Sequence, residues 1–163
     1  MPNRYFVISL LIVVATAVLS VGTYNRWWDL RLDIGPVYLS HLLGWIGFAF
    51  IAIYTPIYSY AKRRTQRGFK FLLNTHNVGN LIAFTLISMH FTQQIGRPAE
   101  FYPELGTGLA LYISVCLMVL TGFLMRFKFV KQLSKTWRFI HTGFVLPFYV
   151  LILVHVLHGF GIV

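Results

Sequence analysis

The amino-acid sequence predicts an all-α fold: an integral membrane bundle of five transmembrane helices, with the N-terminus in the cytoplasm and the C-terminus outside. The first observation is composition, because 57% of the 163 residues are apolar and 11% are charged, against about 45–50% and about 25% in soluble domains. The second is a series of long apolar runs, each of the length that crosses a lipid bilayer as a helix. The third is the placement of Lys and Arg in short blocks between those runs. That pattern is typical of membrane proteins and argues against a nucleic-acid partner, despite the net charge of +10.

Five stretches meet the length criterion, and short connections join them. They are residues 5–22, 36–60, 74–95, 106–125 and 137–163. Because Arg4 precedes the first, it resembles a secretory signal peptide, but its apolar core is long and no clear A-x-A site follows, so we expect an uncleaved helix. Pro147 is expected to kink the last helix. No internal repeat is evident, so we expect one transmembrane domain over 1–163, with a first helix and loop at 1–35 and a core at 36–163.

The distribution of basic residues predicts the orientation. Arg4, five residues of segment 62–70 and five residues of segment 126–138 give eleven basic side chains on one side. The other side has three basic residues and all four acids: Arg26, Arg31, Arg97, Asp29, Asp33, Glu100 and Glu104. Because cytoplasmic loops carry an excess of Lys and Arg, we expect a multi-pass cell-membrane protein with its N-terminus inside.

Six histidines lie in or at the ends of these apolar stretches, where ionisable side chains are costly and usually functional. His76 and His90 are 14 residues apart on the third predicted helix, and His141 and His155 are 14 residues apart on the fifth. At about 100° per residue, 14 steps end about 40° short of four full turns, so each pair lies on one helix face, about 21 Å apart along the axis. Both helices are expected to run outward, which puts His76 and His141 near the cytoplasm and the other pair at matching depth toward the outside.

Two helices that each present two histidines at equal spacing can hold two stacked planar metal cofactors. The pattern favours two b-type haems, because haem iron takes one imidazole on each side. His76 and His141 would ligate the inner haem iron, and His90 and His155 the outer haem iron. A zinc site needs three or four ligands at one point, which ligands about 21 Å apart cannot supply. The alternative is that these histidines are polar contacts between helices.

The residues around the histidine pairs permit more than one interpretation. Between His76 and His90 the same face carries mostly small side chains, which either leave space for a macrocycle or allow close helix packing; they are Gly79, Asn80, Ala83 and Ile87. His41 and His158 are both expected on the outer side. They either form a pocket for an electron acceptor, a quinone head group or a metal ion, or are interfacial histidines. Cys116 is the single cysteine, which excludes an internal disulfide and CxxC chemistry.

Three segments carry a family resemblance. They are His76-Asn-Val-Gly-Asn-Leu-Ile-Ala-Phe through His90, Leu120-Thr-Gly-Phe-Leu, and Trp137-Arg-Phe-Ile-His141 through His155. Together they resemble the ferric reductase-like transmembrane domain superfamily, which includes ferric reductases, NADPH oxidases and the haem-binding membrane subunit of the periplasmic methionine sulfoxide reductase system. The resemblance covers residues 36–163. It implies the same four haem ligands and electron flow from a cytoplasmic donor to an external acceptor, in a prokaryotic inner or plasma membrane.

The sequence also departs from that family. Its members commonly have six helices, whereas five are expected here. Eukaryotic members carry a flavin and nicotinamide domain, and this sequence has no G-x-G-x-x-G in a strand–helix context. A separate protein or membrane quinol is therefore expected to supply electrons.

Three functional hypotheses follow. The first is transmembrane electron transfer through two bis-histidine b-type haems, from a cytoplasmic flavin-dependent reductase or membrane quinol to an extracytoplasmic acceptor protein or metal ion. The chain would then be an electron-transfer subunit of an oxidoreductase, since the redox chemistry belongs to the cofactor. The second is a cytochrome b anchor subunit that exchanges electrons with quinone in a respiratory dehydrogenase or reductase complex. The third is a haem-free, histidine-lined transporter or proton path.

Overall fold

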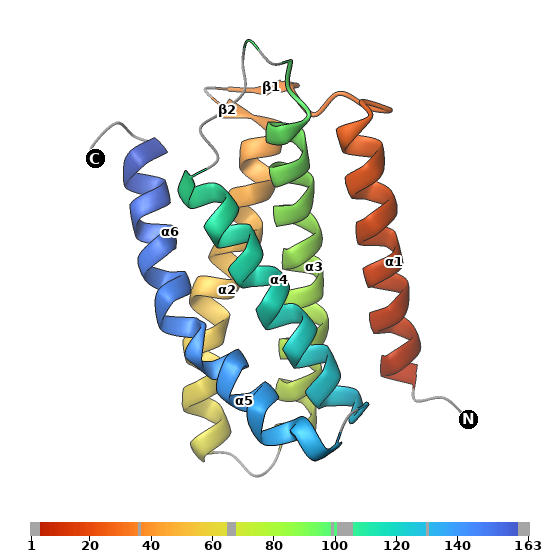
Figure 1. The fold of residues 1–163 in the computed structure, drawn as a ribbon, viewed down its shortest axis with the longest axis vertical. Coiled ribbons are helices and arrows are strands. Elements are labelled where there is room, and N and C mark those ends of the chain that lie inside the picture. The colour runs from red at the N-terminus through yellow and green to blue at the C-terminus, as the bar shows by residue number, and fades with distance from the viewer. Residues whose placement is uncertain are drawn as a thin grey trace. The chain divides into compact units, whose positions relative to one another are not determined.

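The computed structural model describes residues 4–35, 37–64, 68–98, 100, 106–129 and 131–159. Within these residues the chain is almost entirely helical, so the predicted all-α class is confirmed (Figure 1). The α-helices are α1 (Arg4–Tyr24), α2 (Leu39–Arg64), α3 (Phe69–Ile95), α4 (Gly106–Phe127), α5 (Ser134–Gly143) and α6 (Val145–Gly159). A short antiparallel pair, β1 (Asp33–Ile34) and β2 (Val37–Tyr38), precedes α2, and a 3-10 turn, η2 (Lys131–Leu133), precedes α5.

The chain divides into two compact units, Met1–Pro103 and Glu104–Val163. The first unit contains α1, α2 and α3, and the second contains α4, α5 and α6. Each unit therefore contains one of the two histidine pairs. Some positions used in the sequence-based predictions lie outside the described residues: Pro36, Arg67, Glu104 and residues 160–163.

Four helical segments of the described chain are long and apolar enough to cross a membrane. They are Arg4–Tyr24, Leu39–Arg64, Gly106–Phe127 and Lys131–Gly159. The remaining predicted span, at 74–95, falls within α3, which begins at Phe69 and has 27 residues. The length of α3 suffices for a bilayer, but its hydropathy is lowered by polar side chains, among them Asn74, Asn77, Asn80, Gln93 and Gln94. A membrane crossing by α3 stays a prediction.

The last predicted span is interrupted at Phe144, because α5 ends at Gly143 and α6 begins two residues later. Pro147 has no N–H to donate to the carbonyl four residues earlier, that of Gly143, which explains the position of the break. The backbone N–H of Phe144 still donates to Ile140 O at 3.0 Å, so the helical path continues across it. Where a kink was expected from Pro147, the structure has a one-residue interruption just before it.

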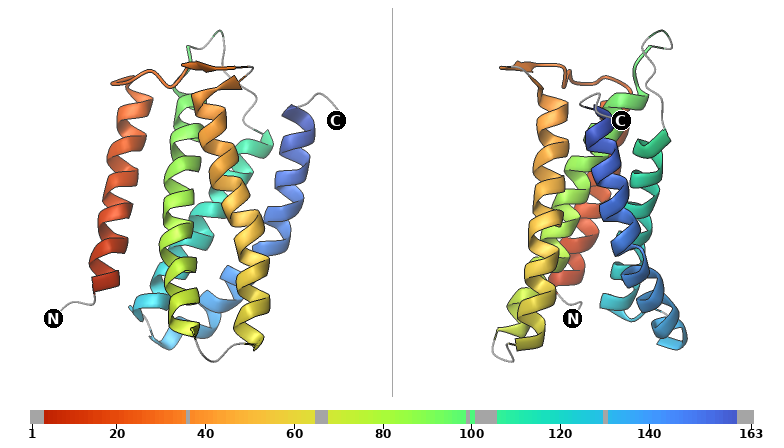
Figure 2. Two further views of the ribbon diagram at one scale, coloured as in Figure 1. Left: turned by 180° about the vertical axis from the view of Figure 1, so that it is seen from behind. Right: turned by 90° about the vertical axis from the view of Figure 1, so that its left-hand side faces the viewer.

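In the first unit, α3 lies between α1 and α2 (Figure 2). The seam between α1 and α3 is polar. The Asn77 amide Nδ2 donates to Ser9 Oγ at 2.7 Å, and the hydroxyl oxygens of Thr16 and Thr85 are 2.7 Å apart. Ser9 and Thr16 lie two helical turns apart and are almost fully buried. Hydrogen bonds of this kind join membrane helices, because lipid gives apolar helix faces no hydrophobic reason to associate.

Replacement of Thr16 and Thr85 by valine, singly and together, is expected to reveal a coupling energy of about 0.6 kcal/mol in a double-mutant cycle. That is the average found for interhelical hydrogen bonds in a membrane protein. The measurement is reversible unfolding of the purified chain in mixed micelles. Thr142 provides the control, because its hydroxyl donates to Arg138 O within its own helix at 2.8 Å. Thr16 and Thr85 also lie near carbonyls of their own helices, Ile12 O at 2.8 Å and Leu81 O at 3.0 Å, so one of the two hydroxyls gives up that bond when it donates to the other. Thr16→Val and Thr142→Val should be additive, and an equally additive Thr16–Thr85 pair would contradict the polar seam.

The loop after α1 ties the end of that helix to the end of α3. Trp28 Nε1 donates to Thr23 Oγ1 at 3.0 Å, and the Trp28 ring lies so close to Gly22 that a Cβ there would overlap it. Arg26 adopts a left-handed backbone conformation with φ 59°, and its guanidinium Nη2 donates to Gly96 O at 2.7 Å. The Arg26 contact thus links the end of α1 to the end of α3, in addition to the polar seam.

In the second unit, α4 packs against both α5 and α6. Its buried side chains include Ser114, Val115 and Thr121, and Phe148 of α6 is 2% exposed. Thr121 Oγ1 donates to Leu117 O at 2.6 Å, so this hydroxyl uses its hydrogen within its own helix. The oxygen lone pairs of Thr121 therefore remain available to a donor on another helix.

Candidate functional site

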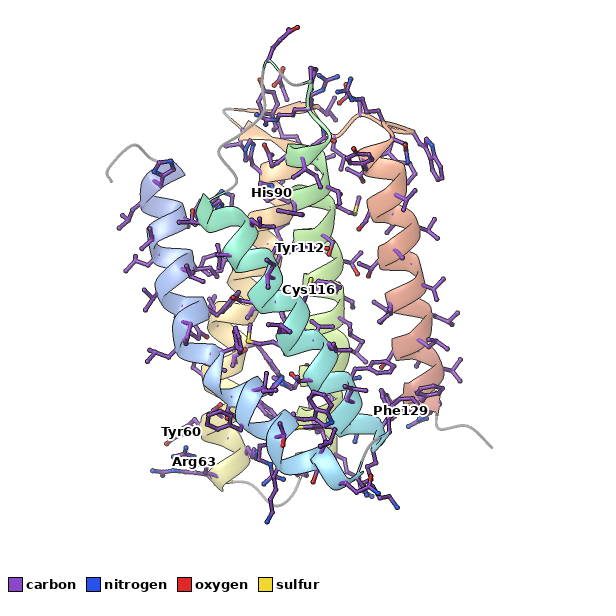
Figure 3. All side chains as sticks on the ribbon, in the orientation of Figure 1. Tyr60, Arg63, His90, Tyr112, Cys116 and Phe129 are labelled. Carbon is purple, nitrogen blue, oxygen red and sulfur yellow. The ribbon has the colours of Figure 1, made fainter. Side chains whose placement is uncertain are left out.

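His90 lies on α3 and its ring reaches the backbone of α2. Its Nδ1 is 3.0 Å from the carbonyl oxygen of Ser40. Gly44, one helical turn after Ser40, permits this approach: a Cβ on Gly44 would lie 2.9 Å from His90 Cγ. Figure 3 shows His90 in the part of the first unit remote from Tyr60 and Arg63, which lie near the other end of α2.

His141 makes an equivalent contact in the second unit. Its Nδ1 is 2.9 Å from the carbonyl oxygen of Met118 and 3.3 Å from Thr121 Oγ1, both on α4. Gly122, one turn after Met118, lies beside the ring, and a Cβ there would be 3.1 Å from His141 Cε1. His141, near the end of α5, is thus anchored to the neighbouring helix α4.

His155 on α6 meets α4 in a similar way. Its Nδ1 is 3.2 Å from Thr107 Oγ1. The adjacent Gly108 leaves room for the ring, since a Cβ on that glycine would lie 3.3 Å from His155 Cε1. We use the term histidine seat for an oxygen on a neighbouring helix that contacts Nδ1, together with the glycine beside the ring. The three seats are Ser40 with Gly44, Met118 and Thr121 with Gly122, and Thr107 with Gly108.

His76 is held differently, by an aromatic ring and an amide. The Tyr58 ring of α2 stacks on its imidazole with centroids 4.2 Å apart and an angle of 12° between the planes. Asn80 Nδ2, one turn along α3, is 3.0 Å from His76 Nδ1. The buried Asn80 Oδ1 has no hydrogen-bond partner among the described residues. A flip of this amide, which exchanges Oδ1 and Nδ2, would bring Oδ1 to the imidazole, where it can accept a hydrogen bond from Nδ1.

The acceptors at these contacts determine which ring nitrogen carries the proton. A carbonyl oxygen can only accept, so Ser40 O and Met118 O require that His90 and His141 donate from Nδ1. In a neutral imidazole the lone pair is then on Nε2, the atom able to bind a metal. A hydrogen bond from the other ring nitrogen to a carbonyl is the usual way in which metal-binding histidines are oriented. His90 and His141 would therefore be able to hold a haem iron through Nε2.

The small residues between His76 and His90 pack against α2. A Cβ on Gly79 would overlap the Phe50 ring, and a Cβ on Gly47 would lie 2.7 Å from Ala83 O. Ala83 is 2% exposed. Of the two interpretations that the sequence left open, close helix packing is therefore the one observed for Gly79 and Ala83.

A one-residue interruption at Phe144 separates His141 on α5 from His155 on α6. Both rings nevertheless contact the same neighbouring helix, α4. Thr107 and Thr121, which contact them, are separated on an unbroken helix by the same interval as the histidines. In the first unit, Gly44 and Tyr58 on α2 are separated by that interval as well.

His41 and His158, the predicted outer acceptor site, belong to different units. The His41 ring lies 5.4 Å from the His90 ring and 5.9 Å from the Tyr38 ring, measured between centroids. Tyr38 is 43% exposed, so a chain of three rings leads from the surface of the first unit to His90. His158 lies on α6, one turn beyond His155. A joint pocket of His41 and His158 stays a prediction.

Within the described residues, no three His, Cys, Asp or Glu side chains form a group that could hold a metal ion by themselves. Cys116 is partly buried in α4.

Comparison with known proteins adds no relative: no family model matches the chain, and neither the curated proteins nor the solved structures gave a match. Fold and site alone therefore define the class of protein. It is an all-helical chain with four membrane-length helical segments, in which histidines are held by the backbone or side chains of their own unit.

The residues of the seats were not identified as functional from the sequence. A signal was nevertheless present. The dipeptide Thr-Gly occurs at 107–108 and again at 121–122, which repeats the interval between the paired histidines. A search for the histidine interval in the other helices would have found it.

Proposed function

We propose that this chain is a di-haem membrane cytochrome that carries electrons from a cytoplasmic reductant to an acceptor on the other side of the membrane. His76 and His141 would hold the inner haem, and His90 and His155 the outer haem. Haem iron, when bound, supplies a one-electron redox couple. The contribution of the protein is to hold the four imidazoles and to place them at two levels along its helices.

The observation that carries this proposal is the engagement of Nδ1. His90 and His141 each donate from Nδ1 to a backbone carbonyl on a neighbouring helix, at 3.0 Å and 2.9 Å. This contact selects the tautomer whose Nε2 can ligate iron and fixes the orientation of the ring. A histidine that only joins two helices through a carbonyl adopts the same tautomer, so haem binding is the property that separates the two roles.

Charge supports the proposed direction. Lys62, Arg63 and Arg64 are exposed at the end of α2, and Lys131 and Lys135 are exposed at the start of the last helical segment. By the excess of Lys and Arg in cytoplasmic loops, both groups are assigned to the cytoplasm, with five spans and the N-terminus inside. Such surfaces suit the docking of an acidic electron donor, because complementary charge speeds encounter.

The resemblance to the ferric reductase-like superfamily points to the same function. It suggests a flavin-dependent reductase or membrane quinol as the donor, and a protein or metal ion as the acceptor. The Tyr38–His41–His90 chain of rings gives the outer ligand an aromatic connection to the exposed end of the first unit. That end is the proposed side of electron exit.

A pyridine haemochrome assay of the detergent-purified chain, with protein quantified by amino-acid analysis, tests the proposal. About two b-type haems per chain and a low-spin reduced spectrum are expected, because each iron would have two imidazole ligands. The protein is to be produced with added haem precursor so that supply does not limit loading. One haem per chain would contradict one of the two pairs.

Absence of haem under those conditions would overturn the proposal and favour a histidine-lined transporter or proton path. Reduction of the loaded protein by a quinol analogue in membranes would assign the donor as quinol. Reduction that depends on an added cytoplasmic flavoprotein would assign the donor as that protein.

A further inference from the structure

Each of three histidine rings has a glycine of a neighbouring helix beside it. Gly44, Gly108 and Gly122 each lie against a histidine ring on the next helix of the same unit. The virtual Cβ distances are 2.9 Å to His90 Cγ, 3.3 Å to His155 Cε1 and 3.1 Å to His141 Cε1. By contrast, Gly106 on α4 has nothing within 4 Å of a virtual Cβ.

Two of these glycines stand at a specific offset from the oxygen that the histidine contacts. Gly44 follows Ser40 by four residues, and Gly122 follows Met118 by four residues. In an α-helix, a side chain leans toward the N-terminus and covers the turn before its own Cα. The side chain four residues after a carbonyl therefore shields that carbonyl from a neighbouring helix. Glycine at this position exposes the carbonyl oxygen to a second donor.

We propose that Gly44 and Gly122 are positioning residues that expose a helix carbonyl to a histidine and thereby fix its tautomer. His90 and His141 then donate from Nδ1 and present Nε2. Gly108 does not stand at this offset; it leaves room for the His155 ring beside the Thr107 hydroxyl, which can donate or accept. The assignment of Nε2 to iron rests on the proposed function, whereas the tautomer itself does not depend on haem.

Thr121 strengthens the seat of His141. Its hydroxyl hydrogen goes to Leu117 O at 2.6 Å, so its oxygen can only accept from His141 Nδ1, 3.3 Å away. Both oxygens near this ring, one from Met118 and one from Thr121, thus require the same tautomer. His76 lacks such a glycine and has the Tyr58 ring and the Asn80 amide instead.

Nitrogen-15 NMR of the full-length chain, labelled in its histidine rings and prepared without haem, tests the proposal directly. Single histidine replacements assign the signals. We expect His90 and His141 to be protonated at Nδ1 and unprotonated at Nε2. Protonation of either ring at Nε2 in the unaltered protein would overturn the proposal for that seat.

Gly122→Ala tests the role of the glycine. Its methyl group would displace the His141 ring, so the Nδ1-protonated signal of His141 should be lost or become a mixture of tautomers, while that of His90 is unchanged. Gly106→Ala, on the same helix but in open space, should leave both signals unchanged. An unaltered His141 tautomer in folded Gly122→Ala protein would contradict the positioning role.

Thr121 supplies a second pair of variants that does not depend on tolerance of a clash. Thr121→Ser keeps the hydroxyl and should keep the His141 tautomer, whereas Thr121→Val removes the accepting oxygen and should weaken the preference. For haem titrated into the purified chain, Gly122→Ala is expected to raise the dissociation constant about 10- to 100-fold, the usual cost of losing a contact that orients a metal ligand. An unchanged constant would contradict the role of Gly122 in ligation.

The two proposals fail separately. If the predicted tautomers are found but the chain binds no haem, the role of the glycines is supported and the cytochrome function is contradicted. If two haems bind but His90 and His141 are protonated at Nε2 in the haem-free chain, the cytochrome function is supported and the role of the glycines is contradicted.

Discussion

His90→Ala is expected to lower the haem content of the purified chain from about two to about one per polypeptide. Loss of a contact that merely orients a metal ligand costs about 10- to 100-fold in affinity, so removal of the ligand itself should exceed that range. The remaining haem, held by His76 and His141, should stay low-spin. His155→Ala should give the same result, because it removes the opposite ligand of the same iron. The measurements are haemochrome stoichiometry and a potentiometric titration, in which one of two redox components should vanish.

The complementary variants His76→Ala and His141→Ala should remove the other component. His158→Ala is the matched control, because it removes an imidazole from α6 one turn beyond His155 and should retain both haems. Two low-spin haems in any one of the four ligand variants would disprove that ligand assignment. Loss of all haem from every one of them would contradict two independent sites.

Gly47→Ala is expected to destabilise the first unit by about 1–3 kcal/mol, the typical cost of overfilling a packed interior. The new methyl group would lie 2.7 Å from Ala83 O and 3.0 Å from Ile87 Cγ1. Because the nearer atom belongs to the backbone, the clash is relieved only by moving α2 away from α3. Replacement of a helical glycine by alanine otherwise gains about 1 kcal/mol in helix propensity, so a net loss would show that the clash dominates. Unfolding in mixed micelles measures the difference.

The same displacement should reach the histidines. Since His90 contacts α2 at Ser40 O, separation of the two helices should weaken this hydrogen bond and broaden the His90 signal. Gly106→Ala serves again as the control for added helix propensity without a clash. If Gly47→Ala proves as stable as the unaltered chain, the close contact between α2 and α3 is not as the structure describes it.

Hydropathy and charge were sufficient to predict the helical class and the position of each long helix. The bounds differ mainly at polar ends: the segment predicted at 36–60 is observed as Leu39–Arg64, because basic residues extend the helix past the apolar run. Apolar length cannot detect such extensions, since exposed Lys and Arg are good helix formers. At α3 the helix begins at Phe69 and not at Asn74, because the apolar residues Phe71, Leu72 and Leu73 continue it on the other side of Lys70.

The histidine interval selected the four residues of the candidate site, but it did not predict the contacts that hold them. Between His141 and His155 the helix is interrupted at Phe144, where Pro147 removes one hydrogen bond, and both rings nevertheless contact α4. The contact of His141 with Met118 O uses a backbone carbonyl, which any residue at position 118 would supply, so the residue type there gives no indication of it. The one visible trace of such a contact is the glycine four residues later.

The placement of each seat has a consequence for how the protein is made. His90 is anchored to α2 and His141 to α4, each by contacts inside its own unit. On the proposed function, these contacts would order the rings ahead of haem binding and so remove a cost of about 0.5–1.5 kcal/mol per ordered side chain from that step. On the proposed function, biogenesis can therefore proceed in halves: each segment leaves the insertion machinery with its ligands already set, and cofactor delivery becomes the final event of assembly.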